Sequence, residues 1–347
     1  MSGGVDSSTA AALLCESGVE VVGATLRLYD AAGTSASIGG RCCGPRDIED
    51  ARQTAAALGF AHYVLDESEA FNAAVIEDFV HEYRAGHTPN PCVRCNEKLK
   101  FAPLVRFARA IGAEALATGH YARVEPGPDG VRLRRAVDRD KDQAYFLFAV
   151  TPSLLPFVRF PLGGMTKDEV RAHARRLGLP NWDKPDSQQI CFIPDGDHKA
   201  FVARKGGAGP AGEILDEQGR VLGQHPDTHH FTVGQRKGVP AVGGADPRFV
   251  LRIDVATGRV HVGPRVELGR RELRVADARW LGPVRAGDQP LACDVQIRHH
   301  ASAHAATITA GAHGVRVELE RPVEAVAPGQ AAVFFRGDEV LGGGWIQ

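Results

Sequence analysis

The chain has 347 residues, of which 44% are hydrophobic and 24% charged, as in an ordinary soluble globular protein. Its 41 basic and 42 acidic residues leave a formal net charge of −1, so any nucleic-acid contact would depend on local patches. No apolar run approaches the roughly 20 residues of a membrane span, and the N-terminus lacks the pattern of a secretory signal. Seven cysteines favour functional thiols in a reducing cytoplasm over a secreted disulfide framework.

The chain opens on the sequence Ser2-Gly3-Gly4-Val5-Asp6-Ser7-Ser8, followed at once by an Ala- and Leu-rich segment. Glycines allow a close backbone approach, and Ser7 or Ser8 can cap a helix, so N–H groups and the helix dipole would converge on a phosphate. Asp6 would repel that phosphate unless a cation lay between them, which predicts a Mg²⁺ neighbour. No Gly-Lys-Ser/Thr follows, so the loop is not a Walker A motif. The pattern is that of enzymes that split ATP between its α and β phosphates.

The first two hundred residues alternate between helix-like and strand-like segments. Helical patterns cover Ser8–Glu16, Ile48–Leu58, Phe71–Tyr83 and Lys98–Ile111, and strand patterns cover Val19–Leu26, Ala61–Leu65 and Ala115–Thr118. Such units predict an α/β domain over residues 1–200, with a parallel sheet, helices on both faces and ligands at the carboxyl ends of its strands. In this fold a phosphate loop follows a central strand, so we expect translation to start upstream of Met1.

The pattern changes after Phe201. The breaker-rich segment Lys205–Gly212 indicates a linker. Short strands are then predicted at Glu213–Leu215, Val221–Leu222, His230–Val233, Phe249–Val255, Arg259–Val262, Asp294–Ile297, Val315–Leu319, Ala331–Phe335 and Val340–Leu341. We expect a small β domain over residues 201–272 and a C-terminal β-barrel over residues 273–347.

Two cysteines lie in a proline-stiffened loop that leads into a predicted helix. A thiol near a helix N-terminus with Arg94 and Lys98 nearby should favour its thiolate, so Cys92 and Cys95 are candidate nucleophiles. A structural zinc site would need a second Cys-x-x-Cys pair, which the chain lacks. An iron–sulfur cluster on Cys92, Cys95 and one member of the adjacent pair at 42–43 stays open.

Cys191 is flanked by apolar residues and by itself reads as a buried core cysteine, like Cys15 and Cys293. An ATP-splitting loop combined with a nucleophilic thiol nevertheless suggests one chemistry. ATP would adenylate a carbonyl oxygen, and a persulfide or an amine would then displace AMP.

A series of motifs spans nearly the whole chain. It comprises SGGVDSS (2–8), Ala51-Arg52, TPNPCVRCNEKLKF (88–101), ATGHYAR (117–123), DRDKDQAYFL (138–147), SQQICFI (187–193), FTVGQRKG (231–238), Pro328–Phe334 and Leu341–Gly344. The first motif alone also occurs in argininosuccinate, GMP and asparagine synthetases. In this order, the series resembles that of the bacterial tRNA-specific 2-thiouridylases, a family of the PP-loop ATP pyrophosphatases.

The resemblance implies ATP-dependent 2-thiolation of the wobble uridine (position 34) of tRNA, with release of AMP and pyrophosphate. Cys95 matches the family's nucleophile and Cys191 the cysteine that carries a persulfide, which reverses the reading of Cys191 given above; the two would alternate between thiols and a disulfide. Matched ATP contacts are Ser2, Gly3, Gly4, Val5, Asp6, Ser7, Leu26 and Gly119. Asn90, Pro91 and Cys92 match the loop beside the target base, and further tRNA contacts are His120, Lys141, Asp142, Gln143, Arg298, His299 and Gln330.

The expected partners follow from the same resemblance. They are tRNAs for glutamate, glutamine and lysine, and persulfide-donating relay proteins fed by a cysteine desulfurase, acting on a cytoplasmic monomer without a membrane contact. Residues 248–279 hold eight Arg and four acidic residues, a local excess that could face phosphates. The alternatives are an iron–sulfur-dependent tRNA thiolase, an amide or argininosuccinate-type ligase, and a tRNA-binding protein with an inactive loop.

Overall fold

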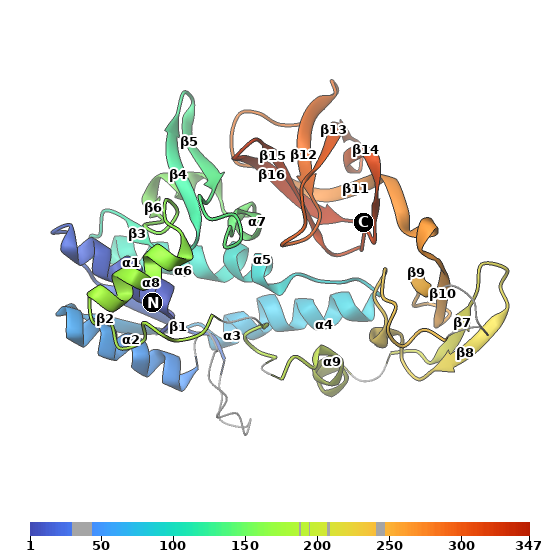
Figure 1. Cartoon of the computed structure of the whole chain (residues 1–347), viewed down its shortest axis with the longest axis horizontal. Helices are drawn as coiled ribbons and strands as arrows, with labels where there is room; N and C mark the ends of the chain where they lie inside the picture. The colour runs from blue at the N-terminus through green and yellow to red at the C-terminus, as the bar shows by residue number, and fades with distance from the viewer. Residues whose placement is uncertain (30–43, 187–188, 194, 207–208, 241–246) are drawn as a thin grey trace.

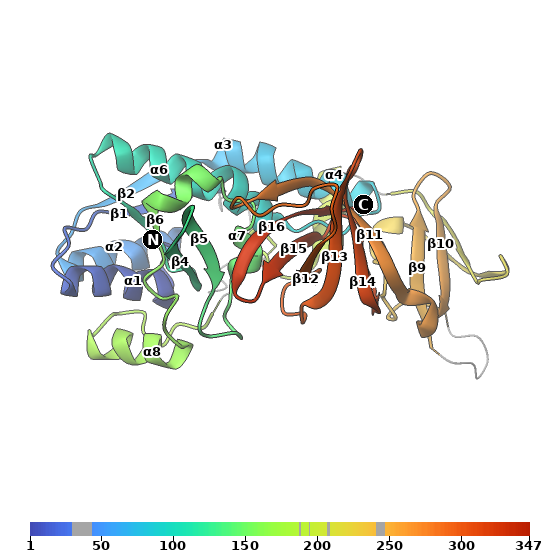
Figure 2. The ribbon, with the colours of Figure 1, turned by 90° about the horizontal axis from the view of Figure 1, so that it is seen from above.

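The protein, seen here as a computed structural model, is described for residues 1–29, 44–186, 189–193, 195–206, 209–240 and 247–347 (Figure 1). An N-terminal α/β part is followed by a small β-sheet and then by a C-terminal β-barrel. Seen from above, the barrel lies between the other two parts (Figure 2). The predicted fold class is therefore confirmed.

The α/β part contains two pairs of parallel strands and most of the helices. Its strands β1 (Gly23–Arg27) and β2 (His62–Asp66) pair with each other, as do β3 (Leu116–Ala117) and β6 (Val158–Arg159). The helices are α1 (Val5–Glu16), α2 (Pro45–Leu58), α3 (Ser68–Phe71), α4 (Glu77–Arg84), α5 (Pro91–Cys95), α6 (Phe101–Ala110), α7 (Ala144–Leu147), α8 (Lys167–Arg176) and α9 (His198–Gly206). Turns of π-helix at Asn72–Ile76 and Asn96–Lys100 continue α3 into α4 and α5 into α6. Turns of 3₁₀ helix lie at Pro152–Phe157, Thr228–His230 and Arg265–Leu268.

The first predicted strand begins too early. The valines at its expected start, Val19 and Val22, are 53% and 40% exposed, and β1 begins only at Gly23. The Val19 N–H donates to the Leu14 carbonyl, so this segment still belongs to the end of α1. An apolar run alone did not separate the helix terminus from the strand that follows it.

An antiparallel hairpin, β4 (Ala122–Gly127) and β5 (Gly130–Arg135), connects the α/β part to the barrel. β5 pairs with β16 through Arg134 and Glu339. The barrel strands are β11 (Gly269–Trp280), β12 (Leu291–Gln296), β13 (His304–Gly311), β14 (Gly314–Glu324), β15 (Ala331–Arg336) and β16 (Glu339–Ile346). They run in the order β11-β14-β13-β12-β15-β16, and pairing of β11 with β16 closes the barrel.

The small sheet has the order β8-β7-β10-β9. Its strands are β7 (Gly212–Leu215), β8 (Val221–His225), β9 (Arg248–Asp254) and β10 (Arg259–Pro264). The strand predicted at His230–Val233 is wrong, because the chain there leaves the 3₁₀ turn without joining a ladder. Phe231 supplies an apolar side chain to the core of this part instead.

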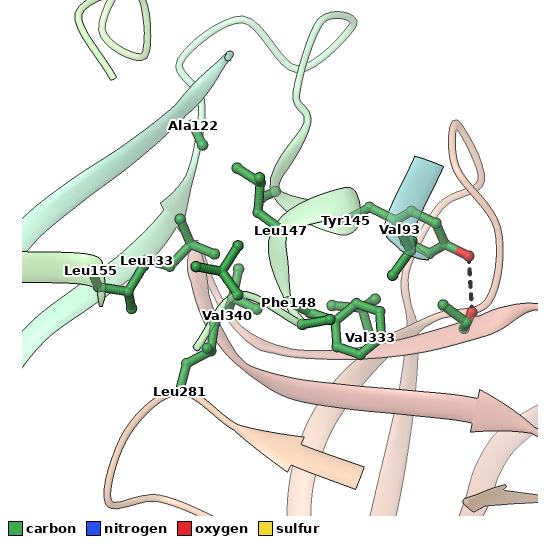
Figure 3. Packing of buried hydrophobic residues seen from close by; sticks show 14 of the residues in the cluster. Val93, Ala122, Leu133, Tyr145, Leu147, Phe148, Leu155, Leu281, Val333 and Val340 are labelled. Atoms are coloured by element: carbon green, nitrogen blue, oxygen red, sulfur yellow. Dashed lines mark hydrogen bonds between the residues drawn. The ribbon is translucent and has the colours of Figure 1, made fainter. Parts of the chain in front are cut away.

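One apolar core joins the α/β part to the barrel (Figure 3). Leu133 of the hairpin, Tyr145 and Leu147 of α7, and Val333 and Val340 of the barrel are all at most 1% exposed. Burial of each such aliphatic side chain stabilises a fold by about 1.5–3 kcal/mol. The two parts are therefore held together by a continuous core. None of the helices in the described ranges is long and apolar enough to cross a membrane.

Candidate active site

The predicted phosphate loop comprises residues 2–7 and leads into the first turn of α1. Gly3 has a φ of +68°, and a Cβ there would lie 2.2 Å from the backbone oxygen of Asp47, so the loop requires glycine. Gly4 caps α1 in an extended conformation, and the Ser7 hydroxyl accepts from Ser2 N–H at 3.0 Å. The first N–H groups of a helix have no partner within the helix and suit an anion.

Two further predicted ATP contacts come from distant segments. A Cβ on Gly119 would lie 2.7 Å from the Ser7 backbone nitrogen, so the Gly119 backbone lies directly against the loop. Leu26 lies near the carboxyl end of β1 and is buried. The structure thus brings Gly119 to the loop and places Leu26 at the edge where ligands of a parallel sheet bind.

Asp6 of this loop is bound by two groups that the sequence analysis did not single out. Its Oδ1 accepts from Lys167 Nζ at 2.6 Å and from the Tyr121 hydroxyl at 2.9 Å. Burial, and then the charge of Asp6, raise the pKa of Tyr121, so the phenol remains a donor. Lys167 is only 8% exposed, and its Nζ also lies 2.7 Å from Asp186 Oδ1.

Asp186 extends this network towards the predicted tRNA segment. Its Oδ2 accepts from Lys141 Nζ at 2.8 Å. Burial raises the pKa of Asp186, but hydrogen bonds from Lys141 and Lys167 outweigh it and hold the pKa below its usual value. Asp186 is therefore an anion shared by two lysines, directly before the motif that contains Cys191.

A second group of contacts, which we call the braces of the loop, fixes its backbone through Asn181 and Lys184. The Gly3 carbonyl accepts from Asn181 Nδ2 at 3.0 Å and from Lys184 Nζ at 3.1 Å. Lys184 Nζ also donates to Asp47 at 2.7 Å and to Asp50 at 2.5 Å. Burial lowers the pKa of Lys184, but these carboxylates outweigh it and raise the pKa above its usual value. Sequence reasoning missed these residues because nothing in local periodicity marks a contact across such a separation.

Cys95 and Cys191 belong to one hydrophobic cluster. Cys95 is buried and 6% exposed, and the partly buried Cys191 packs against the same cluster, which also contains Leu26. Phe192 anchors the Cys191 segment, with its ring edge-on to Phe71 at 5.7 Å and to Phe79 at 5.3 Å. The two cysteines that the resemblance assigns to sulfur transfer thus pack in the same hydrophobic cluster.

The two cations predicted beside Cys95 also bind carboxylates. Arg94 pairs with Asp78 at 3.4 Å and with Glu97 at 3.3 Å, and Lys98 pairs with Asp78 at 4.0 Å. Their effect on the Cys95 thiol stays a prediction. Cys92 is exposed, and Asn90 caps α5 by accepting from Val93 N–H at 3.3 Å.

Several predicted tRNA contacts already have internal partners. Asp142 accepts from Arg135 at 2.9 Å and from backbone N–H groups, and Gln143 accepts from Tyr121 N–H at 3.0 Å. The Gln330 amide donates to the Thr88 carbonyl at 2.8 Å. The side chains of these residues are held by hydrogen bonds within the protein. Their contact with tRNA stays a prediction.

The remaining predicted contacts are His120, Arg298 and His299. His120 stacks on Phe101 at 5.9 Å, and Arg298 donates to the Ala325 carbonyl. His299 lies 4.2 Å from the Phe146 ring, beside α7. Burial, and then the neighbouring His300, lower the pKa of His299 to about 4, so it is neutral at pH 7.

Half of the arginines in the segment 248–279 bind carboxylates from outside the segment, while Arg316 from outside binds its Glu272. The pairs made by these arginines are Arg248–Glu217, Arg259–Glu213, Arg265–Glu324 and Arg279–Glu97. Contact of this segment with phosphates stays a prediction.

The residues around these cysteines give no metal site within the described ranges. No group of three or more His, Cys, Asp or Glu side chains there could hold a metal ion. Cys42 and Cys43, which the iron–sulfur hypothesis requires, lie outside the described residues, as do residues 187–188 of the Cys191 motif.

Comparisons with known proteins agree with this arrangement along the whole chain. Residues 1–195 match the family model described as tRNA methyl transferase HUP domain, residues 199–264 the tRNA methyl transferase PRC-barrel domain, and residues 270–346 the aminomethyltransferase beta-barrel domain. The tRNA-specific 2-thiouridylase MnmA of Rhodospirillum rubrum is 52% identical, over 100% of this chain and 94% of that protein. The chain belongs to the tRNA-specific 2-thiouridylase family.

Other members of the family give the same result. The MnmA proteins of Rhodospirillum centenum and Geobacter metallireducens are each 48% identical over 100% of this chain, covering 90% and 95% of their own lengths. The resemblance drawn from the motif series is therefore confirmed. Two of the matched models are described by methyl transfer, whereas these relatives are named for thiolation.

Proposed function

We propose that this protein is a tRNA-uridine 2-sulfurtransferase that uses ATP to convert the wobble uridine of tRNA to 2-thiouridine. The observation that carries the proposal is that Cys95 and Cys191 both pack in the hydrophobic cluster that contains Leu26, a predicted ATP contact. Methyl transfer needs no such pair of thiols, whereas sulfur transfer through a persulfide does. The names of the full-length relatives support the same activity.

The phosphate loop would bind and orient ATP. N–H groups at the start of α1 would face the phosphates, and Gly119 would allow close approach. Asp6 fits as the group that holds Mg²⁺ bound with ATP, because Mg²⁺ takes one or two carboxylates together with substrate phosphates. When bound, Mg²⁺ would neutralise phosphate charge. Lys167 would offset the charge of Asp6 at 2.6 Å.

The reaction would proceed in two stages. The uridine O2 attacks the α-phosphorus of ATP and releases pyrophosphate, while the N3 proton is lost. Cys191 carries a persulfide. In one route its terminal sulfur attacks C2 and expels AMP, and the Cys95 thiolate then attacks the Cys191 sulfur and releases the sulfur bonded to C2. In the other route Cys95 attacks the Cys191 sulfur first, and the hydrosulfide released attacks C2 and expels AMP. N3 regains its proton, and both routes end with 2-thiouridine, AMP and a Cys95–Cys191 disulfide. A two-electron thiol reductant must restore the thiols before the next cycle.

The partners in this proposal are tRNA and a persulfide donor. The target base must leave its stack to reach the cysteines, which suits the single-stranded anticodon loop. tRNAs for glutamate, glutamine and lysine are the expected acceptors, and the sulfur comes from relay proteins fed by a cysteine desulfurase. We propose a cytoplasmic monomer. No step is assigned to an iron–sulfur cluster.

Thiolation of transcribed tRNA with ATP and a persulfide donor tests the proposal. Cys95→Ser and Cys191→Ser should each abolish 2-thiouridine formation, measured by mass spectrometry of the digested tRNA. Cys15→Ser and Cys293→Ser are matched controls, because both thiols lie outside the cluster. Robust activity of either cluster variant would overturn the assigned roles.

The same assay separates the alternatives. tRNA-dependent release of AMP together with 2-thiouridine supports the proposal. AMP release that needs an amine and no tRNA would indicate a ligase, and tRNA binding without ATP turnover would indicate an inactive loop. Thiolation that requires anaerobically bound iron would indicate an iron–sulfur-dependent thiolase.

A further inference from the structure

The barrel holds the beginning of the loop that leads to Cys95. Thr88 N–H donates to the Pro328 carbonyl at 2.7 Å, and Gln330 Nε2 donates to the Thr88 carbonyl at 2.8 Å. Gly329 has a φ of +85°, and a Cβ there would lie 2.8 Å from the His87 Cβ. The turn before β15 therefore lies directly on residues 87–88, with backbone contacts that leave no room for a side chain.

The barrel also holds the end of the same loop. The Arg94 guanidinium lies 3.8 Å from the centroid of the Trp345 ring, which belongs to β16. Arg94 pairs with Glu97, which is only 5% exposed at its side chain and also pairs with Arg279 of β11 at 2.5 Å. One buried carboxylate is thus shared by an arginine next to Cys95 and an arginine of the barrel.

α7 links the middle of this arrangement to the same part of the barrel. The Tyr145 hydroxyl donates to the Ala331 carbonyl at 3.0 Å, and Asn96 Nδ2 donates to the Phe146 carbonyl at 3.2 Å. Figures 1 and 2 both show α7 adjoining β15 and β16. Pro328, Gln330 and Trp345 thus contact the segment 88–96 directly, and Ala331 is linked to it through α7.

We propose that the C-terminal barrel positions Cys95, and that Arg94 stacked on Trp345 is the pair through which it does so. The inference rests on the proposed function for the role of Cys95. α5 is the first turn of a helical run that continues through Asn96–Lys100 into α6, and the first N–H groups of a helix have no partner within it, so contacts from outside the helix help to fix this turn. Arg94 is adjacent to Cys95, and its charge is already paired with carboxylates. Its contribution is therefore the geometry of this helical turn, which makes Arg94 and Trp345 positioning residues.

Single-turnover thiolation at saturating tRNA and ATP tests the proposal. Arg94→Lys keeps the charge but loses the planar stack, and Trp345→Leu removes the ring. Each should slow the reaction by about 10- to 100-fold, the usual cost of a small misplacement of a reacting group. The double variant should be no slower than the worse single variant, because both changes break one contact. Trp345→Phe should recover most of the rate.

The controls separate positioning from stability and from tRNA binding. Arg175 of α8 lies 4.3 Å from the centroid of the Trp182 ring, so Arg175→Lys is a matched change at another arginine–tryptophan stack. It should leave the rate unchanged, and the Kd for tRNA should change less than twofold in every variant. The proposal would be overturned if Arg94→Lys and Trp345→Leu thiolated tRNA at the wild-type rate, or if their rate losses were additive in the double variant. A loss of tRNA affinity without a loss of rate would also overturn it.

A measurement without tRNA distinguishes failure of this inference from failure of the proposed function. Alkylation of native protein by iodoacetamide, read by peptide mass spectrometry, reports the accessibility of the buried Cys95 thiol. Arg94→Lys and Trp345→Leu should raise the rate at Cys95 at least threefold relative to the rate at Cys293. If the wild-type protein thiolates no tRNA, the proposed function fails, while unchanged alkylation in both variants would overturn positioning by the barrel.

Discussion

Lys167 Nζ lies 2.6 Å from Asp6 Oδ1, although the two residues are 161 positions apart in the chain. The same ammonium lies 2.7 Å from Asp186, which also binds Lys141. Asp186 directly precedes the motif of Cys191, and Lys141 belongs to the predicted tRNA segment. A chain of ion pairs thus connects the phosphate loop with both other parts of the proposed site.

Replacing Lys167 should therefore weaken ATP binding. In Lys167→Met, Asp6 loses its cation while Asp186 keeps Lys141 and Arg171, so the unpaired charge of Asp6 would oppose the incoming phosphates. We expect the Kd for ATP with Mg²⁺ to rise about tenfold, which corresponds to about 1.4 kcal/mol. Isothermal titration calorimetry measures this Kd. Lys199→Met on α9 is the control, because it makes the same substitution in another helix. An ATP affinity equal to that of the control would contradict the role given to Lys167.

Gly119→Ala should also act on the phosphate loop. The new Cβ would lie 2.7 Å from the Ser7 nitrogen, a backbone atom that cannot move without shifting the first turn of α1. Gly164→Ala is the matched control, because a Cβ there meets nothing within 4 Å. We expect ATP binding to fall at least tenfold in Gly119→Ala, an effect that corresponds to about 1.4 kcal/mol or more. Equal affinities for ATP in the two variants would show that Gly119 does not shape the loop.

The sequence predicted the parts of the site that depend on local chemistry. Residues 2–8 could be interpreted as a phosphate loop because two glycines and a helix start form a short-range pattern. The β4–β5 hairpin was missed although its signal is present: residues 122–125 and 131–134 alternate, and Gly127-Pro128-Asp129-Gly130 is a turn sequence.

The braces of the loop could not be predicted in the same way. Asn181 and Lys184 bind the Gly3 carbonyl from more than 170 positions away, as the separations of 178 and 181 show. Ion pairs and amide contacts of this kind have no periodicity in the sequence. For Cys191, its apolar neighbours alone indicated an ordinary core cysteine; the motif series assigned it to sulfur transfer, and the structure places it against the cluster of Cys95.

Phe192→Leu tests the anchoring of the Cys191 segment. The substitution removes two edge-on ring contacts, each contributing about 0.5–1.5 kcal/mol beyond area burial, so we expect stability to fall by about 1–3 kcal/mol. Thiolation from a preformed Cys191 persulfide should slow as well, because the sulfur is less well oriented. Phe231→Leu, in the core of the small sheet, is a control that should reduce stability only. Equal rates of persulfide transfer in the two variants would show that Phe192 does not orient the Cys191 segment.

The stability of the protein should fall in mild acid partly because of His120. The ring lies against Phe101 and Phe160, and its Nδ1 lies 2.7 Å from the Thr118 hydroxyl oxygen. Burial, and then the charge of Lys100, lower the pKa of His120 to about 3. Between its usual value of about 6.5 and this lower value, the unfolded chain binds a proton that the folded protein does not. The free energy of unfolding must therefore fall as the pH falls through this window.

His120→Gln should reduce that pH dependence. The titrating group is lost, so between pH 6 and pH 4 the unfolding free energy of the variant should decline less steeply than that of the wild type, by up to about 1 kcal/mol per pH unit. Urea unfolding at pH 7.5, 6, 5 and 4 measures the slope, and His313→Gln at an exposed hairpin tip is the matched control. Because other buried histidines titrate in the same window, the difference between wild type and variant isolates His120. Identical slopes for the two would mean that His120 is protonated in the folded protein as readily as in the unfolded chain.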